Sequence, residues 1–422
     1  MLKVTGASMI GTMFDYYDFF VGGLAAAVVW PTVFYPQVDP ALSLFLSVTS
    51  FAIGYITRPL GSVLFGHFGD KLGRLSVLIW TLITTGIGTV GIALTPSYAA
   101  IGVAGAYLIV TFRLIQGIGA GGEWGGAATL VAEYAKDSKH RAFWVSWVQQ
   151  GNSLGTVLST AVWAYLFVTM PRAQFFDWGW RIPFYIGVIV LIIGLAIRYS
   201  LLESPVFKQY VLKKGKGRFP IVELLQKEWK KVLIASAVPL IQAGSSGWVT
   251  TVATPFSMRL GVPASVTANA LVWGSIVGIF GLAGLALVAD KLGRRVGLII
   301  GGLAGAGLAL PYMYMLRTGD VTLTIIATIL IAFTSRMGSG VFPAVLTEQF
   351  PARYRFTASA LSYSLFGVWS SLVQIIANYV FMVFGGPAFS WIPLALILMT
   401  VNLLTVVAGL IVTRTKRQDI AY

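Results

Sequence analysis

The sequence contains no cysteine and only two histidines among its 422 residues. Without cysteine the chain cannot form a disulfide or a thiolate metal site. His67 and His140 both fall on polar stretches between apolar runs. No Ser–His constellation, metal-ligand cluster or Gly-rich phosphate-binding loop ending in Lys-Ser/Thr is present. We therefore expect a protein that is not an enzyme and that holds no metal and no cofactor.

Charge is also scarce, since 11% of the residues are charged, against roughly 25% in a soluble domain. Apolar runs of about 20 residues, enough to cross a bilayer, recur along the whole chain. Segments that cross lipid without a closed barrel must be helices, because their backbone groups find no water. We expect an all-α membrane protein with twelve transmembrane helices, at about 9–34, 42–66, 75–95, 101–132, 142–168, 181–202, 232–257, 265–289, 296–316, 322–346, 357–384 and 391–413.

The net charge of +15 is distributed as a membrane topology signal. If both termini are cytoplasmic, most basic residues fall on cytoplasmic loops, as the positive-inside rule requires. This pattern favours the plasma membrane and contact with anionic lipids, and it argues against nucleic acid as a partner. The expected cytoplasmic set is Lys71, Arg74, Lys136, Lys139, Arg141, Lys291, Arg294, Arg295, Arg353, Arg355, Arg414, Lys416 and Arg417, and the opposite loops hold Arg172, Arg181, Arg259 and Arg317.

One charged motif occurs twice. Residues 69–74, Gly-Asp-Lys-Leu-Gly-Arg, return as Ala-Asp-Lys-Leu-Gly-Arg at 289–294, each time between two apolar runs. We interpret the motif as a short loop in a duplicated membrane protein, as in many secondary transporters.

The polar stretch 203–231 separates the two copies of this arrangement. We expect an N-terminal six-helix bundle at 1–202, a linker at 203–231 and a C-terminal six-helix bundle at 232–422. Within the linker, Ile221, Leu224 and Leu225 have the spacing of an amphipathic helix on the cytoplasmic membrane surface. A solvated linker is the equal alternative.

Further motifs carry a family resemblance. They are Asp15-Tyr16-Tyr17-Asp18, Arg58-Pro59-Leu60-Gly61, Arg113-Leu114-Ile115-Gln116-Gly117, Gly121-Gly122-Glu123-Trp124-Gly125-Gly126, Glu203-Ser204-Pro205 and Phe350-Pro351 with Arg353. With the repeated motif they resemble the major facilitator superfamily. Within it they resemble the metabolite:proton symporters, relatives of dicarboxylate, shikimate, citrate and proline/betaine permeases. The first motif departs from the Glu-Trp-Tyr-Asp usual in that family. The resemblance implies two pseudo-symmetric six-helix bundles, a monomer, and transport by alternating access.

Ionisable residues inside the bilayer are costly and therefore point to function. Counted at ~1.5 Å per helical residue, Asp18, Arg58 and Arg113 lie near the middle of a ~30 Å core. The resemblance places Asp18 and Arg113 within reach of each other. An Asp beside an Arg stays ionised, and it gains a proton if the Arg is drawn away. We therefore expect proton coupling at Asp18 with Arg113. Asp15, one turn away, is the alternative carrier, and a purely structural bridge is the other alternative.

A guanidinium suits a substrate carboxylate. Arg58 is one candidate, with bracing of the second span against the fourth or eleventh as the alternative, and Arg336 is another. For the uncharged candidates the alternative is interhelical hydrogen bonding or packing. The expected substrate-binding residues are Arg58, Arg113, Arg336, Gln149, Gln242, Trp248, Tyr363, Trp369 and Gln374.

The repeated motif predicts conformational control. Asp70 and Asp290 should cap the helix that follows each of them or pair with a basic neighbour. Ion pairs of Arg74 and Arg294 with Glu133, Glu203 or Glu348 at cytoplasmic helix ends would hold one state closed. Glu123 is expected to act mainly on conformation, with a proton relay as the alternative. The expected gating residues are Asp70, Arg74, Glu123, Glu133, Glu203, Asp290, Arg294 and Glu348.

These features predict proton-coupled symport of a small organic solute, a carboxylate metabolite above all. Sugar or polyol transport, or uptake of a zwitterion such as proline or betaine, is the main alternative. A non-transporting membrane sensor is a distant one.

Overall fold

The computed structural model describes residues 1–200, 220–244, 246–384 and 386–412, and in these ranges it contains helices and no strand. The first half comprises α1 (Leu2–Val28), α2 (Trp30–Phe34), α3 (Pro40–Leu72), α4 (Arg74–Leu94), α5 (Tyr98–Ile101), α6 (Ala104–Tyr134), α7 (Arg141–Thr169), α8 (Arg172–Asp177), η1 (Gly179–Arg181) and α9 (Ile182–Tyr199). The second half comprises α11 (Pro220–Lys227), α12 (Trp229–Ala237), η2 (Val238–Gly244), α13 (Ser246–Trp248), η3 (Val249–Ala253), α14 (Thr254–Met258), α15 (Ala264–Leu292), α16 (Arg294–Arg317), α17 (Val321–Ser339), α18 (Phe342–Glu348), α19 (Arg355–Val383) and α20 (Pro387–Val412). The expected all-α class is confirmed.

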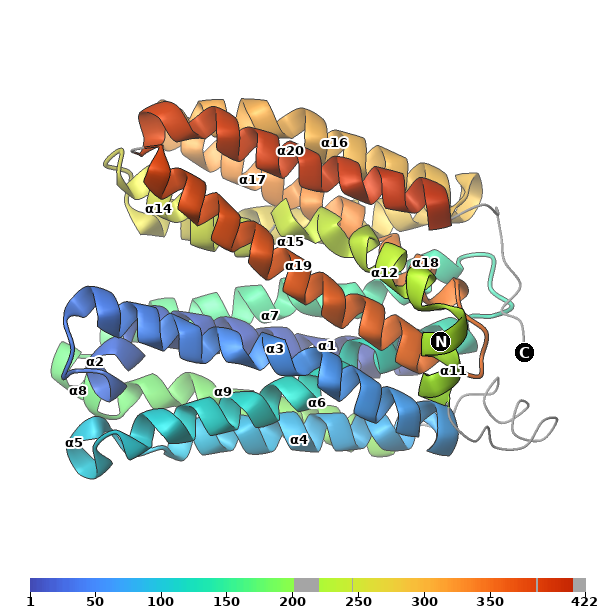
Figure 1. Cartoon of the computed structure of the whole chain (residues 1–422), viewed down its shortest axis with the longest axis horizontal. Coiled ribbons are helices and arrows are strands. Elements are labelled where there is room, and N and C mark those ends of the chain that lie inside the picture. The colour runs from blue at the N-terminus through green and yellow to red at the C-terminus, as the bar shows by residue number, and fades with distance from the viewer. Residues whose placement is uncertain (201–219, 245, 385, 413–422) are drawn as a thin grey trace.

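The long helices lie side by side in two bundles, one blue to green and one yellow to red (Figure 1). α1 begins and α20 ends at the same end of the molecule, which we call the terminal face. The short helices α2, α5 and α8 lie at the opposite end (Figure 1). The terminal face carries the repeated motif, because α3 and α15 both end there.

Within the described residues, eight helical segments are long and apolar enough to cross a membrane. The other expected spans fall on α1, α3, α7 and the run α12–α14. α1, α3 and α7 have 27, 33 and 29 residues, which is ample length for a span. Their lower hydropathy follows from the buried polar side chains that they carry.

The expected seventh span, 232–257, is not one continuous helix. The α-helix α12 is followed by the 3₁₀ segment η2, the short α13, the π-helical η3 and α14. Pro239 and Pro255 lack the N–H that an uninterrupted α-helix requires. Transporters tolerate such breaks where the backbone is buried in protein or lines a cavity.

The expectation of a charged loop is wrong for most of the repeated motif. Asp70 and Asp290 lie in the last turns of α3 and α15. Only Gly73 and Gly293 leave the helical conformation, with φ of 127° and 103°. Glycine adopts positive φ without a steric penalty, so each helix ends and the next begins within one residue.

The expected linker helix is present as α11, in which Leu224 is buried and Leu225 is 48% exposed. Residues 203–219 of the expected linker lie outside the described residues. Placement of α11 on the membrane surface stays a prediction.

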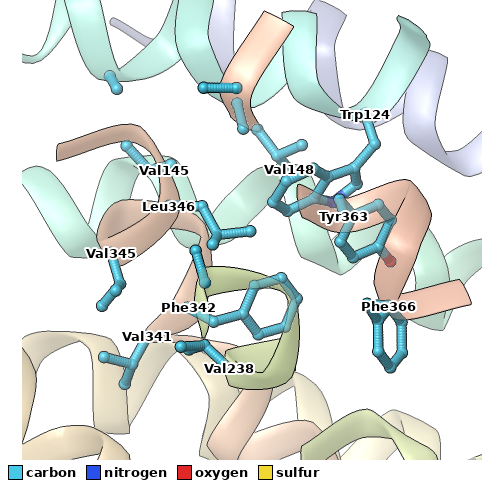
Figure 2. Packing of buried hydrophobic residues seen from close by; sticks show 14 of the residues in the cluster. Trp124, Val145, Val148, Val238, Val341, Phe342, Val345, Leu346, Tyr363 and Phe366 are labelled. Carbon is cyan, nitrogen blue, oxygen red and sulfur yellow. The ribbon is translucent and has the colours of Figure 1, made fainter. Parts of the chain in front are cut away.

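The two halves share a hydrophobic cluster (Figure 2). Trp124 and Val148 of the first half pack with Phe342, Leu346 and Tyr363 of the second. The six-residue glycine-rich motif in α6 makes this approach possible, since small residues let membrane helices come close.

Gly125 shows how close the halves approach. A Cβ at this position would lie 2.3 Å from the Cα of Ala360 in α19. Gly121, one turn earlier, faces α3 instead, where a Cβ would lie 2.1 Å from the carbonyl oxygen of Arg58. The motif therefore lets α6 pack closely both against α3 of its own half and against α19 of the other half.

Gly125→Ala tests this contact. The added methyl would overlap the backbone at Ala360, so we expect stability to fall by about 1–3 kcal/mol, the usual cost of overpacking. The thermal unfolding midpoint of the purified protein in detergent measures the loss. Gly284→Ala is the control, because a Cβ there meets nothing within 4 Å. Equal midpoints for the two variants would contradict the close contact.

Candidate functional site

A pocket in the first half holds four charged residues, Asp15, Asp18, Arg58 and Arg113. Its walls come from α1, α3, α4 and α6. Asp15 and Asp18 are each 4% exposed there, and they lie three positions apart on α1. The lining residues are Asp15, Asp18, Phe19, Gly54, Tyr55, Arg58, Thr85, Arg113, Gln116, Gly117 and Ala120.

Arg58 forms an ion pair with Asp15, at 3.5 Å from Nη2 to Oδ1. Its guanidinium also lies over the Tyr55 ring, 4.9 Å from the ring centre. The ion pair thus joins α3 to α1. The expected bracing of α3 against the fourth or eleventh span is therefore not the contact that Arg58 makes.

Asp18 and Arg113 line the same pocket, but they are bridged rather than paired directly. Arg113 Nη1 donates to Gln116 Oε1 at 2.5 Å, and Gln116 Nε2 donates to Thr89 Oγ1 at 2.9 Å. Thr89 Oγ1 in turn donates to Asp18 Oδ1 at 2.8 Å. Among the described residues, Asp18 has no ion pair. Asp18 and Arg113, at the two ends of this series of hydrogen bonds, were expected site residues. Thr89, which lies between them, was not predicted from the sequence.

Glycine makes room for the Arg113 side chain. A Cβ at Gly22 in α1 would lie 2.9 Å from Arg113 Nη1. The guanidinium also lies 4.3 Å from the centre of the Phe51 ring and donates to the Phe51 carbonyl at 3.2 Å. The cation is therefore held in place by one aromatic face, one carbonyl and one amide.

A second cluster lies between the halves, around Tyr363 (Figure 2). The Tyr363 ring stacks on Trp124 at 3.8 Å, and its hydroxyl bonds to that of Tyr16. Tyr363 also donates to Gln242 Oε1 at 3.2 Å, and Trp124 Nε1 donates to Gln149 Oε1 at 2.9 Å. The expected substrate-binding residues Gln149, Gln242 and Tyr363 are thus brought together, outside the charged pocket.

Three further expected substrate-binding residues, Trp248, Trp369 and Gln374, make other contacts in the part of the chain that the structure describes. Trp248 is buried in the core of the second half. Trp369 donates to Ser236 at 3.0 Å, and Gln374 accepts a bond from Thr251 at 3.2 Å.

Arg336 in α17 spans the interface between the halves. It is 1% exposed and donates to Thr156 of α7 at 3.2 Å and to Ser275 of α15 at 3.4 Å. A buried guanidinium beside hydroxyl groups is a suitable anion site.

Of the two alternatives expected for the aspartates of the repeated motif, the structure shows the ion pair with a basic neighbour. Asp70 pairs with Arg74 at 2.5 Å, and Asp290 pairs with Arg294 at 2.7 Å, as expected for a basic neighbour. Neither Asp caps the helix that follows it, because Gly73 and Gly293 occupy those positions.

Instead, each Asp binds the start of a helix in the other half. Asp70 accepts from the backbone N–H groups of Phe356 and Thr357, at 3.1 and 2.9 Å, in the first turn of α19. Asp290 accepts from those of Ala142 and Phe143, both at 2.9 Å, in the first turn of α7. We call this arrangement the crossed caps. A carboxylate at a helix N-terminus satisfies free N–H groups and favours the helix dipole.

Glutamates extend the crossed caps. Glu133 pairs with Arg74 at 3.3 Å and with Arg355 at 3.0 Å. Glu348 pairs with Arg294 at 2.8 Å and with Arg141 at 3.4 Å. The expected partners of Arg74 and Arg294 were Glu133, Glu203 and Glu348. Glu203 lies outside the described residues.

Arg141 and Arg355 are functional candidates that were expected only as basic residues of cytoplasmic loops. Each is the first residue of a long helix, α7 or α19, and each follows a short polar stretch. The repeated motif marks the α3 and α15 ends of the interface but not these two helix starts.

Glu123 makes its contacts within the first half. It forms a buried ion pair with Arg198 of α9 and accepts from Thr81 of α4 at 2.8 Å. Arg198 is a functional candidate that sequence motifs do not mark, although it stands inside an apolar run. In the described chain, no group of His, Cys, Asp and Glu is placed to hold a metal.

Comparison with known proteins places this geometry in context. A model of the Major Facilitator Superfamily matches residues 9–374. An inner membrane metabolite transport protein of Escherichia coli is 34% identical over 431 residues, covering 99% of this chain and 95% of that protein. The Escherichia coli shikimate transporter is 34% identical over 97% of this chain and 94% of its own length. The Salmonella typhimurium proline/betaine transporter is 30% identical over 89% and 77%.

Among solved structures, the proton:xylose symporter XylE superposes with a TM-score of 0.77 over 97% of this chain and 94% of that chain. Its sequence is 18% identical, so the likeness concerns the fold.

Asp70→Asn tests the crossed caps. The chain has no cysteine, so Ser364→Cys supplies a single thiol. Ser364 is 4% exposed, and its hydroxyl oxygen lies 2.5 Å from that of Ser62 in the other half. Replacing a charged acceptor by a neutral one weakens its bonds to α19 by about 1–1.5 kcal/mol. We expect labelling of this thiol by a water-soluble maleimide to speed up roughly tenfold.

Asp320→Asn in the same background is the matched control. Asp320 caps α17 of its own half by accepting from Leu323 N–H at 2.8 Å. Labelling that is unchanged by Asp70→Asn, or equally fast in both variants, would show that the crossed caps do not hold the halves together.

Proposed function

Because this chain belongs to the Major Facilitator Superfamily, whose members are multi-pass membrane transporters and not enzymes, we propose that it is a proton-coupled symporter of small organic carboxylates. The observation that carries the proposal is the pocket in which two carboxylates and two guanidiniums lie together, with Asp15, Asp18 and Arg113 buried and Arg58 partly buried. Burial of these ionisable groups costs too much to be retained for packing alone. A relative that is named as a shikimate transporter supports a carboxylate solute.

We assign the proton to Asp18. Its carboxylate is buried, and a hydroxyl rather than a cation holds it. Such a carboxylate can gain a proton without leaving an arginine that has lost its ion-pair partner. Asp15, by contrast, is neutralised by Arg58 at 3.5 Å, so protonating it would leave that cation uncompensated. Asp15 remains the alternative carrier once a substrate occupies Arg58.

We assign the substrate carboxylate to the guanidinium of Arg58, of Arg113 or of Arg336. A carboxylate that binds Arg58 would replace Asp15, and the displaced acid would then favour its neutral form. Substrate entry and proton uptake would thereby be linked through one ion pair. Gln149, Gln242 and Tyr363 form the proposed contact surface between the halves.

Alternating access follows from the position of the crossed caps. We propose that residues 1–202 and 232–422 move as two units, joined by 203–231, in a monomer. The terminal face would then be the cytoplasmic face, and the contacts that Asp70 and Asp290 make across the halves would close it. The residues that we propose as gates are those whose contacts join the two halves.

Purified protein in liposomes that contain a pH dye tests this function. Shikimate, succinate, proline, glycine betaine and xylose are added outside, without an imposed gradient. We expect a carboxylate to acidify the lumen, because proton and solute enter together. Asp18→Asn should abolish that signal and pH-driven accumulation, and radiolabelled counterflow should remain within about twofold of wild type.

Each component of the panel decides between functions. A response to xylose alone would favour sugar transport, and one to proline or betaine alone would favour a zwitterion. Counterflow without any proton signal from the wild type would contradict proton coupling. Accumulation that survives in Asp18→Asn would place the proton elsewhere.

Arg336→Lys tests the anion site of the second half. Lysine keeps the charge but loses the planar fork of donors. We expect the half-saturating concentration of the transported carboxylate to rise about tenfold. Arg181→Lys is the control, because Arg181 donates to the carbonyls of Ala93 and Thr95 near the opposite face. Unchanged affinity in Arg336→Lys would remove Arg336 from the site.

A further inference from the structure

We infer that Thr89 is a positioning residue for the proton site, and that its hydroxyl reverses direction when Asp18 gains or loses a proton. The inference rests on the proposed function, because it takes Asp18 as the proton carrier. It concerns a residue of α4 that carries no charge and is completely buried.

Three polar atoms surround the Thr89 hydroxyl. Asp18 Oδ1 lies at 2.8 Å, Gln116 Nε2 at 2.9 Å and the carbonyl oxygen of Thr85 at 3.1 Å. A hydroxyl has one hydrogen to donate and two lone pairs to accept with. The single hydrogen can therefore point to Asp18 or to Thr85, but not to both.

Arg113 fixes which side of Gln116 faces Thr89. A guanidinium only donates, so Gln116 must accept from it through Oε1, at 2.5 Å. The amide nitrogen of Gln116 is then turned toward Thr89, and it donates in either protonation state. One lone pair of the Thr89 oxygen is thus always occupied, which leaves one lone pair and one hydrogen for Asp18.

Ionised Asp18 uses the hydrogen of the Thr89 hydroxyl, and protonated Asp18 uses its free lone pair. When Asp18 is ionised, it accepts the Thr89 hydrogen. When a proton adds to the Asp18 carboxylate and forms an O–H bond, that O–H donates to the free lone pair of Thr89, and the Thr89 hydrogen turns to the Thr85 carbonyl. No heavy atom has to move. Neither state leaves a buried polar group without a partner, which would cost roughly 1–3 kcal/mol.

The charged groups near Asp18 do not take over this role. They are Arg113 of α6, Arg58 of α3 and Asp15 of α1, with the phenols Tyr17 and Tyr55 beside them. Within the described chain, the hydrogen bond to the Asp18 side chain comes from Thr89. Thr89 therefore decides how easily the carboxylate changes charge.

Thr89→Val tests this with infrared spectroscopy on the purified protein, which needs no substrate. The band to follow is the C=O stretch of the protonated carboxyl that titrates in wild type and is missing in Asp18→Asn. Thr89 stabilises ionised Asp18 more than neutral Asp18, because a bond to a charged acceptor is stronger. Valine should raise the midpoint pH of the band by about one unit. It should also move the band to higher wavenumber, since the carboxyl loses its acceptor.

Thr89→Ser should restore both the midpoint and the band position. Thr95→Val is the matched control at the C-cap of α4, because Thr95 is buried and its hydroxyl donates to the Gly91 carbonyl, at 2.7 Å. If Thr89→Val does not reach the membrane, Thr89→Ala is measured in its place, with the same expectation.

The outcomes separate this inference from the proposed function. A titrating band that is lost in Asp18→Asn but unchanged in Thr89→Val would overturn the role of Thr89 and leave Asp18 as the carrier. A wild type whose infrared titration does not differ from that of Asp18→Asn would overturn both. A shift of equal size in Thr95→Val would reduce the effect to packing of α4.

Discussion

A charge buried in a membrane protein has to be matched inside the chain, because the surrounding hydrocarbon offers no partner. This structure meets the constraint in three ways. Asp15 is matched by a cation, Asp18 by a hydroxyl at the end of a hydrogen-bonded chain, and Asp70 by Arg74 together with backbone N–H groups at a helix start. The three solutions differ in how easily they are undone. A hydrogen bond to a hydroxyl survives protonation, whereas the ion pair and the cap both need the negative charge.

The crossed caps make each half incomplete without the other. Asp70 of the first half completes α19 of the second, and Asp290 of the second completes α7 of the first. The same motif supplies both caps, so each copy of the motif in the duplicated chain caps a helix of the other half. Separation of the halves at the terminal face would expose two carboxylates and two helix starts together. Water can then satisfy all of them, so the closed and open states can be close in free energy.

The ion pairs divide into those within a half and those between halves. Glu123 and Arg198 tie α6 to α9 inside the first half, whereas Glu133 and Arg355 connect the two halves. Fixed contacts inside each unit and breakable contacts between units are what rigid-body motion requires. The glycines of α6 serve both purposes, since Gly121 packs within the half and Gly125 packs across the interface. A single helix thus links the charged pocket to the surface on which the halves meet.

The sequence by itself determined the membrane class, the helices and the residues that carry buried charge. Length of an apolar run and depth of a charge within it are local properties, so Asp18, Arg58 and Arg113 could be found without coordinates. The partners could not. Arg58 binds Asp15 and Asp70 binds α19 because helices distant in sequence approach closely, and that approach depends on where glycine removes side chains at the contact. Thr89 carried no signal in the sequence, because a threonine in an apolar helix is ordinary. Only the tertiary structure placed its hydroxyl between a carboxylate, an amide and a carbonyl, where the direction of one hydrogen depends on the charge beside it.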